Sequence, residues 1–358
     1  MRDVAALPTA VLAVMLVFAG AGVPAPGIGV AETFRATRLS RNPLISVASS
    51  PSPGDNVNGP SVVRAPEWVA RPLGRFYMYF AHHTGTFIRL AYADAIEGPW
   101  KIYEPGVLQV RDSAFYRPQP DPPSSPAGFY THVASPEIYL DSDRKKLITW
   151  FHGWWTANRQ WPLNASDARE WARQNGYGQY TQVVESDDGL HFEIRTPITK
   201  ESYLRVFREQ GMFYGLARLG ILSRSSDPLR AFELGPNPFR DGRYAGRVRH
   251  VALLRRANTL NVFFSGIGDA PEHIMLSTID LQGDWRMWKA SAPVDVLQPE
   301  AAYECPNLPN APSQAGEIEG RAKQMRDPAV FEDNGRTFFF YTICGEQGIA
   351  GAELESTK

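Results

Sequence analysis

The feature that most constrains the fold is a short unit that recurs along the chain. Its clearest copy opens on Arg326-Asp327-Pro328, continues as an apolar run to Asn334-Gly335, and returns as the aromatic run of residues 336–341. Asn-Gly between two apolar runs is a strong hairpin signal, because both residues of such a tight turn must accept positive φ angles. This stretch therefore predicts two antiparallel strands joined by a turn.

Weaker copies of the same unit precede it. Each copy reads as a strand, a turn, an aromatic strand, a loop and a third strand, with Gly, Pro, Asn or Asp at the boundaries. The five units cover about residues 60–110, 130–199, 200–240, 247–298 and 325–355. Their spacing varies too much for a solenoid of fixed period. Repeated antiparallel sheets with variable loops predict an all-β protein, a five-bladed β-propeller, and a β-sandwich is the alternative.

The fifth unit lacks an obvious outer strand. A segment near residues 43–47, Pro-Leu-Ile-Ser-Val, precedes the first unit and is able to supply that strand and close the ring. We therefore expect residues 32–358 to form a single domain. The second unit carries an insertion over residues 154–178, of which 165–174 has helical composition.

The N-terminus has the pattern of an export signal. Arg2 precedes an apolar run over residues 10–21, and Gly29-Val30-Ala31 offers a cleavage point. The run is shorter than the ~20 residues that a membrane-spanning helix needs. Residues 1–31 thus predict a cleaved signal peptide and a secreted or periplasmic protein that is not held in a membrane. A buried N-terminal helix is the alternative.

Composition and motifs narrow the partners. Lys and Arg number 37 against 38 Asp and Glu, with no basic tail, which disfavours a nucleic-acid partner. Glycine-rich phosphate loops, Gly-x-Ser-x-Gly and His-Glu-x-x-His are absent from the sequence, so no cofactor or metal is expected, although a cation in the central channel stays open. Cys305 and Cys344 either form a disulfide or remain free thiols, and the sequence favours neither alternative. The oligomeric state is left open.

Propeller geometry predicts which polar side chains meet. The first strand of a blade lies nearest the axis and successive strands alternate in direction, so first-strand starts and second-strand ends share one face. These positions hold five of the seven histidines, together with carboxylates and arginines: Asn58, His132, Glu137, Arg205, His250, Arg326, Asp327, His82, His83, His152, Asp269 and Glu346. With Trp154 and Trp155 nearby, such a set is typical of a sugar-binding active site. Each member also has a purely structural reading, as a hydrogen-bonded loop residue or an ion-pair partner.

The units resemble the five-bladed propeller glycosidases: arabinanases, β-xylosidases, invertase-type fructosidases and agarobiose-cleaving exo-hydrolases. Ser135-Pro136-Glu137 resembles the Ala-Pro-acid opening of their second blade. Arg326-Asp327-Pro328 resembles the Arg-Asp-Pro of invertase-type enzymes, in which the acid stabilises the transition state. The resemblance implies a glycoside hydrolase that cleaves a poly- or oligosaccharide with two carboxyl groups.

The first blade departs from that pattern. Where those enzymes open it with Asp-Pro, whose Asp is base or nucleophile, this chain has Asn58-Gly59-Pro60. We expect Asp327 and Glu137 to be the essential acids, with His250 as a further general acid because an unperturbed imidazole has a pKa of about 6.5. The expected sugar contacts are Asn58, His82, His83, His132, His152, Arg205, Arg326, Glu346 and Trp154. The alternatives are a propeller that binds carbohydrate without cleaving it and a metal-dependent hydrolase.

Overall fold

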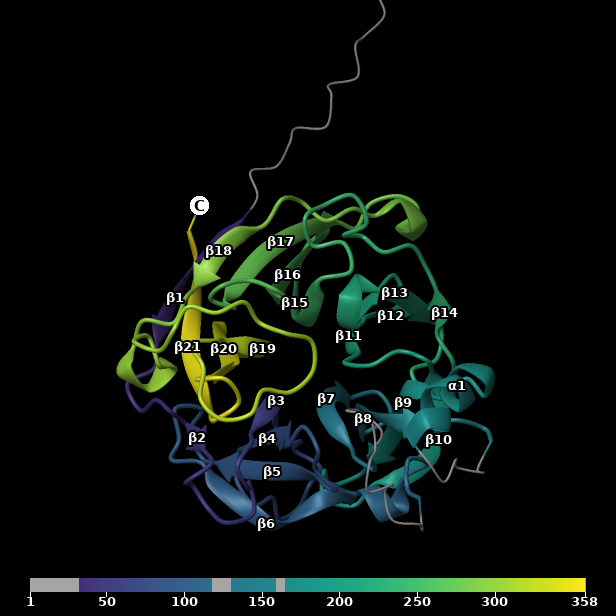
Figure 1. Ribbon diagram of the computed structural model, residues 1–358. Helices are drawn as coiled ribbons and strands as arrows, with labels where there is room; N and C mark the ends of the chain where they lie inside the picture. The colour runs from purple at the N-terminus through teal and green to yellow at the C-terminus, as the bar shows by residue number, and fades with distance from the viewer. Residues whose placement is uncertain (1–31, 118–129, 159–164, 358) are drawn as a thin grey trace, which may run out of the picture.

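The computed structural model describes residues 32–117, 130–158 and 165–357. The predicted signal peptide, residues 1–31, lies outside the described residues. Five antiparallel sheets radiate from a central axis (Figure 1), which confirms the predicted five-bladed β-propeller. None of the helices in the described ranges combines the length and the apolar character needed to cross a bilayer.

Each blade follows the chain from the axis outward. The first blade comprises β3 (Asn58–Arg64), β4 (Phe76–Ala81), β5 (Phe87–Ala93) and β6 (Lys101–Gln109). The second comprises β7 (Ala134–Asp141), β8 (Lys146–Trp155), β9 (Gly178–Ser186) and β10 (Glu193–Thr199). The third comprises β11 (Arg205–Glu209), β12 (Met212–Leu216), β13 (Leu222–Ser225) and β14 (Glu233–Leu234). The fourth comprises β15 (Val248–Arg256), β16 (Thr259–Gly266), β17 (Ile274–Asp280) and β18 (Val294–Leu297).

Both ends of the described chain meet in the fifth blade. Its strands β19 (Arg326–Asp333), β20 (Arg336–Ile343) and β21 (Gly348–Thr357) are completed by β1 (Thr33–Arg38), whose Thr33 pairs with Thr357. Two residues of the segment predicted to close the ring, β2 (Ile45–Ser46), also pair with β21. The longer closing strand, β1, was not expected, because its TFRATR sequence is short, partly polar and only half buried.

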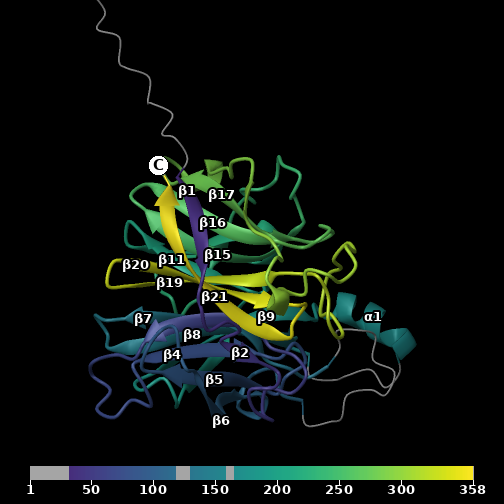
Figure 2. The same ribbon diagram turned by 90° about the vertical axis from the view of Figure 1, so that its left-hand side faces the viewer.

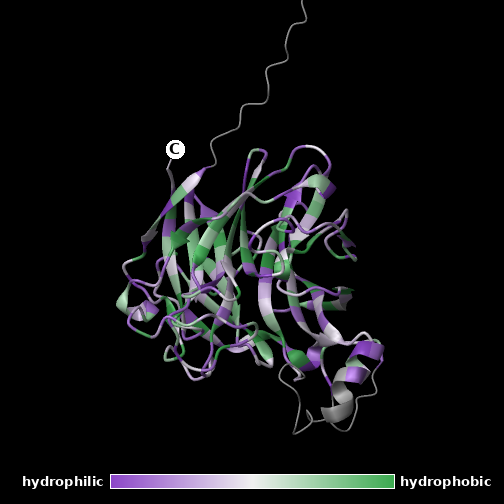
Figure 3. Ribbon diagram, turned by 45° about the horizontal axis from the view of Figure 1, so that its top comes forward, coloured by the Kyte–Doolittle hydropathy of each residue, from purple (hydrophilic) through white to green (hydrophobic). Residues whose placement is uncertain are grey.

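The hydrophobic core lies between adjacent blades. The aromatic second strands supply much of it: every residue of β4 is buried, and Phe263 of β16 packs on Phe339 of β20 with ring centroids 5.2 Å apart. Edge-on and tilted aromatic contacts of this kind stabilise a core by about 0.5–1.5 kcal/mol each beyond the area they bury. Hydrophobic residues are concentrated in the strands and hydrophilic residues in the loops (Figure 3). The insertion forms α1 (Ala165–Gln174), which projects at one side of the molecule (Figure 2).

The first strands are bulged near the axis. Register shifts interrupt the pairing of β3, β7 and β19 at their starts, and the residues Gly59, Ser135 and Asp327 at those points have positive φ angles. A proline follows in each case. A bulge turns a side chain away from the regular alternation of the strand and is common beside binding sites. These Gly-Pro, Ser-Pro and Asp-Pro pairs therefore shape the centre of the ring.

Arg205 of the third blade connects the other four blades at this centre. Its guanidinium donates hydrogen bonds to backbone carbonyls of β3, β7, β15 and β19, and to the Glu137 carboxylate; the carbonyls are those of Pro60, Pro136, Val251 and Pro328. The side chain is almost fully buried. Arg205 was predicted to contact sugar, but its guanidinium donates hydrogen bonds to other groups of the protein instead.

We expect Arg205→Met to lower the free energy of unfolding by about 3–5 kcal/mol, because it leaves the Glu137 charge without its partner. Equilibrium urea unfolding measures this change. Arg208→Gln, on the same strand but half exposed, is the matched control and should change stability by less than about 0.5 kcal/mol. In the double variant Arg205→Met/Glu137→Met the loss should be smaller than in the single one. A loss below about 1 kcal/mol for Arg205→Met would contradict the assigned role.

Candidate active site

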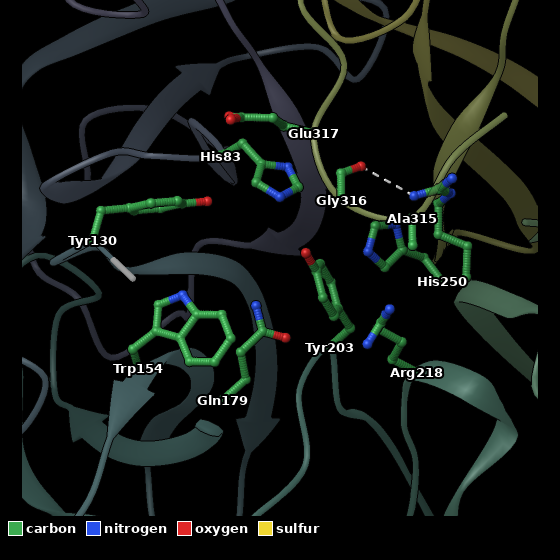
Figure 4. Close-up of a pocket in the computed structure, with 11 residues that line it drawn as sticks. His83, Tyr130, Trp154, Gln179, Tyr203, Arg218, His250, Ala315, Gly316 and Glu317 are labelled. Carbon is green, nitrogen blue, oxygen red and sulfur yellow. Dashed lines mark hydrogen bonds between the residues drawn. The ribbon is translucent and has the colours of Figure 1, made fainter. Parts of the chain in front are cut away.

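A cavity of about 330 Å³ lies at the mouth of the ring (Figure 4). The side chains and backbone that line it come from several blades: His83, Tyr130, Trp154, Gln179, Tyr203, Arg218, Arg249, His250, Ala315, Gly316 and Glu317. Aromatic faces beside imidazole, amide and guanidinium groups make a cavity that is apolar on its walls and polar at fixed points. Such a lining suits a small polar ligand with an apolar face.

Three of the predicted site residues line the cavity directly: His83, Trp154 and His250. The others do not line the cavity, but some of them contact residues that do: Asp327 contacts His250, and Glu346 contacts His83. The Asn58 amide donates to Asn56 Oδ1 at 3.0 Å, and His82 Nε2 lies 2.8 Å from Asp55 Oδ1, which is exposed. Glu137 lies deeper, where its Oε2 also accepts a hydrogen bond from Ser61 Oγ at 3.0 Å.

His250 and Asp327 form a buried pair between the fourth and fifth blades. Nδ1 of His250 contacts Oδ1 of Asp327, and Thr342 Oγ1 donates to the other carboxylate oxygen at 3.0 Å. The bulge in β19 turns Asp327 toward this neighbour, since its φ angle is 52°. Burial lowers the pKa of His250 well below its usual range, and the charges of Arg249 and nearby arginines lower it further. The imidazole is therefore neutral and directs Nδ1–H to Asp327.

A chain of alternating charges lies under the cavity floor. Arg326 bridges Glu272 and Glu346 at 3.0 Å each, and Arg249 Nε donates to Glu272 at 2.6 Å. His83 Nδ1 lies 3.4 Å from Glu346. Burial opposes ionisation of Glu346, but His83 and Arg326 hold its pKa well below its usual range. Arg326 and Glu346, both predicted site residues, thus form a buried ion pair whose opposite charges compensate each other.

Two more of the predicted histidines form a series of ring contacts with Tyr203, in which His152 packs on Tyr203 and His132 packs on His152. The ring centroid of His152 lies 4.2 Å from that of Tyr203 and 5.7 Å from that of His132. Burial lowers the pKa of His132 to about 3 and that of His152 well below its usual range. Neither ring is exposed and neither lines the cavity, so both are neutral buried groups.

Several cavity residues were not found from the sequence: Tyr130, Gln179, Tyr203, Arg218, Arg249, Ala315, Gly316 and Glu317. Tyr130, Tyr203 and Arg249 lie within two residues of the predicted residues His132, Arg205 and His250, and a wider window around each of these positions includes them. Glu201, two residues before Tyr203, does not line the cavity, and burial raises the pKa of its carboxyl to about 7. The remaining residues lie on loops and outer strands, for which strand geometry makes no prediction.

Residues 306–325, here called the strap, join the fourth blade to the fifth and bring Gly316 and Glu317 to the cavity. Arg249 and Arg326 both donate to the carbonyl of Gly316, at 3.2 and 3.4 Å. A disulfide between Cys305 and Cys344 ties the start of the strap to the end of β20. The Asp269 carboxylate, another predicted residue, is held by Arg243, Tyr244 and Arg247, and its backbone accepts from Ser313 of the strap at 3.0 Å.

Removing this disulfide should destabilise the protein by about 4 kcal/mol in the chain-entropy model, because the bridge closes a loop of 39 residues. The measurement is urea unfolding of Cys305→Ala/Cys344→Ala against the oxidised wild type. Reduced wild type should unfold like the double variant. Equal stability of all three forms would contradict the expectation.

In the part of the chain that the structure describes, no group of three or more His, Cys, Asp or Glu side chains is arranged to hold a metal ion. The titratable side chains at the cavity include those of His83, His250 and Glu317, and Asp327 contacts His250.

The propeller is similar to solved structures of carbohydrate-active enzymes. A GH43 β-xylosidase/α-arabinofuranosidase from a compost metagenome, solved with xylotriose, matches with a TM-score of 0.55 and 13% identity, over 90% of this chain and 96% of that one. The GH43_1 enzyme of Xanthomonas citri, solved with xylose, matches with a TM-score of 0.55 and 10% identity, over 88% and 92%. At these identities the likeness shows the fold alone. It confirms, for the fold, the resemblance to five-bladed propeller glycosidases.

No family model matches the sequence. One curated protein does: "Uncharacterized protein R118" of Acanthamoeba polyphaga mimivirus is 33% identical over 320 residues. The match spans 84% of this chain and 83% of the viral protein. An identity of this size over so much of both sequences shows common descent, and the chain belongs to the same family as the mimivirus protein.

Proposed function

We propose that the protein is an exported glycoside hydrolase that binds one end of a poly- or oligosaccharide in the mouth cavity. The observation that carries the proposal is His250, a cavity residue held by a buried carboxylate between two blades. The fold shared with GH43 enzymes supports it, and the N-terminal sequence supports export. A cavity of about 330 Å³ accepts a single sugar ring rather than a long chain.

The lining suits a sugar in detail. Trp154, Tyr130 and Tyr203 present aromatic surface for the apolar face of a pyranose or furanose ring. Gln179 and the two tyrosine hydroxyls face the same space (Figure 4) and are placed to exchange hydrogen bonds with sugar hydroxyls. This division of apolar and polar groups gives both affinity and orientation.

Hydrolysis of a glycosidic bond requires a group that takes a proton from water and a group that gives one to the leaving oxygen. In the neutral His250 the Nδ1 hydrogen faces Asp327, so Nε2 carries the lone pair. We assign His250 as the base: Nε2 takes a proton from water, the water oxygen bonds the anomeric carbon, and the glycosidic bond breaks. Asp327 orients the ring and stabilises the imidazolium that forms. The sequence had suggested His250 as an acid, but its burial favours the base.

The proton for the leaving oxygen needs an acid that faces the cavity. Burial raises the pKa of the Glu201 carboxyl to about 7, but Glu201 does not line the cavity, whereas Glu317 does. Glu137, expected from the sequence to be an essential acid, has Oε2 engaged by Arg205 and Ser61. We therefore assign the proton donor to Glu317 and a supporting role to Glu137.

The first test is a screen of the purified mature protein against aryl glycosides and plant and algal oligosaccharides. We expect release of a monosaccharide from a chain end. Binding by titration calorimetry with no product after long incubation would overturn the hydrolase. It would favour a carbohydrate-binding propeller, the second candidate, for which the specific observation is an amide, Asn58, at the first-blade position where related folds are expected to carry an acid.

A further inference from the structure

We propose that the sugar accepted by the mouth cavity is acidic, carrying a carboxylate or a sulfate group, and that Arg218 binds this group. The inference rests on the proposed function for the site and extends it to a class of substrate. It is carried by the position of Arg218 in the cavity and by the pairing of the charges around it.

Arg218 is held in place by its backbone. It opens a short turn, Arg218–Gly220, between β12 and β13, and its backbone N–H donates to Ser202 at 3.0 Å. The next residue, Leu219, has a φ angle of 65°, and its carbonyl accepts from the Asn237 amide at 2.7 Å. The guanidinium reaches the cavity beside Tyr203 and Gln179 (Figure 4). Arg218 is thus a fixed element of the wall.

The other arginines around the cavity have carboxylate partners. Arg249 and Arg326 share Glu272, Arg326 also pairs with Glu346, and Arg205 pairs with Glu137. No ion pair or side-chain hydrogen bond of Arg218 occurs within residues 32–117, 130–158 and 165–357. Its positive charge nevertheless acts within the wall, where it is one of the influences on the pKa values of Tyr203 and His152.

The carboxylates near the cavity are not available to Arg218. Asp327 is occupied by His250, and Asp269 by Arg243, Tyr244 and Arg247. Glu317 is exposed on the strap and lies on the opposite side of the cavity in Figure 4. A planar guanidinium binds a carboxylate or a sulfate through two parallel hydrogen bonds, which are stronger than bonds to neutral hydroxyls. A bound acidic sugar supplies the partner that the protein omits.

The experiment measures binding without turnover, so that it stands apart from the test of hydrolysis. Titration calorimetry compares glucose and galactose with glucuronate, galacturonate and galactose 6-sulfate, for the wild type, Arg218→Gln and Arg218→Glu. Arg208→Gln, in the same blade and outside the cavity, is the control. The uronates report on a carboxylate and the sulfated sugar on a sulfate.

We expect wild type and Arg208→Gln to bind at least one acidic sugar roughly tenfold to a hundredfold more tightly than its neutral counterpart. Arg218→Gln should abolish the preference and keep the affinity for neutral sugar, and Arg218→Glu should bind acidic sugars more weakly than neutral ones. Equal binding of acidic and neutral sugars by the wild type would overturn the inference, as would Arg218→Gln weakening both alike. If the protein prefers acidic sugars but releases no product from any glycoside, the proposal that it is a hydrolase is wrong and the role of Arg218 stands. If it hydrolyses neutral glycosides alone, it is a hydrolase and the role assigned to Arg218 is wrong.

Discussion

Replacing Asp327 with Asn should leave the propeller folded and reduce turnover on the order of a thousandfold or more, as expected when a carboxylate that holds a catalytic histidine becomes an amide. The carboxylate only accepts hydrogen bonds, so it holds the hydrogen of His250 on Nδ1. An amide at this position is able to donate instead, which places the hydrogen on Nε2 and removes the lone pair that takes the proton from water. The developing imidazolium also loses its counter-charge.

The measurement is kcat and KM on the glycoside identified by the screen. We expect KM to change little, because Asp327 lies behind His250 and does not line the cavity. Asp333→Asn is the matched control: it lies at the far end of the same strand, paired with Arg64, and should keep full activity. Thermal melts of both variants check folding. Retention of more than about a tenth of the wild-type kcat by Asp327→Asn would exclude the pair from the chemistry.

Acidification from pH 6.5 to 5 should lower the free energy of unfolding, by about 2 kcal/mol for His132 alone. His132, His152 and His250 are buried, and their pKa values are lowered in the folded protein. Below the unfolded-state pKa of about 6.5 the unfolded chain binds protons that the folded chain does not. Stability is therefore complete above that pH and falls as the pH drops toward the folded value of His132, about 3, by at most about 1.4 kcal/mol per pH unit for each histidine.

Urea unfolding at a series of pH values between 7 and 5 measures this slope. His152→Phe keeps an aromatic ring between His132 and Tyr203 and should reduce the slope by the share of one histidine. His191→Gln is the control, because His191 is exposed and should leave the slope unchanged. A free energy of unfolding that does not change between pH 7 and 5 would contradict the neutral state of His132, His152 and His250 in the folded protein.

The five-bladed architecture and part of the candidate site can be predicted from local sequence signals. Hairpins are made by neighbours in the chain, so Asn334-Gly335 and the aromatic runs predict the blades directly. The alternation of strands around an axis then places His250 and Asp327 at the same mouth, and the structure brings them into contact. Their residue types and positions were enough to predict both as site residues, but not to predict that they contact each other.

The rest depends on interactions that sequence spacing does not reveal. Arg205 was expected to contact sugar, but the backbone carbonyls of Pro60 and Pro136, at the bulges of β3 and β7, accept hydrogen bonds from it. Arg218 lies on a turn after a second strand whose sequence has no special signal, and the strap reaches the cavity through tertiary hydrogen bonds to Arg249 and Arg326. Burial, which makes His250 neutral, is likewise a property of the assembled ring.

The pairing of Thr33 with Thr357 fixes the order in which the molecule is completed. The other four blades are built from strands close in sequence, but the fifth needs the first and last described residues together. Closing a loop of that length is entropically costly and comes late in folding. Until β21 is in place, β1 has no pairing partner and β20 has none on its outer side. Addition of β21 thus completes the fifth blade, whose Asp327 contacts the cavity residue His250.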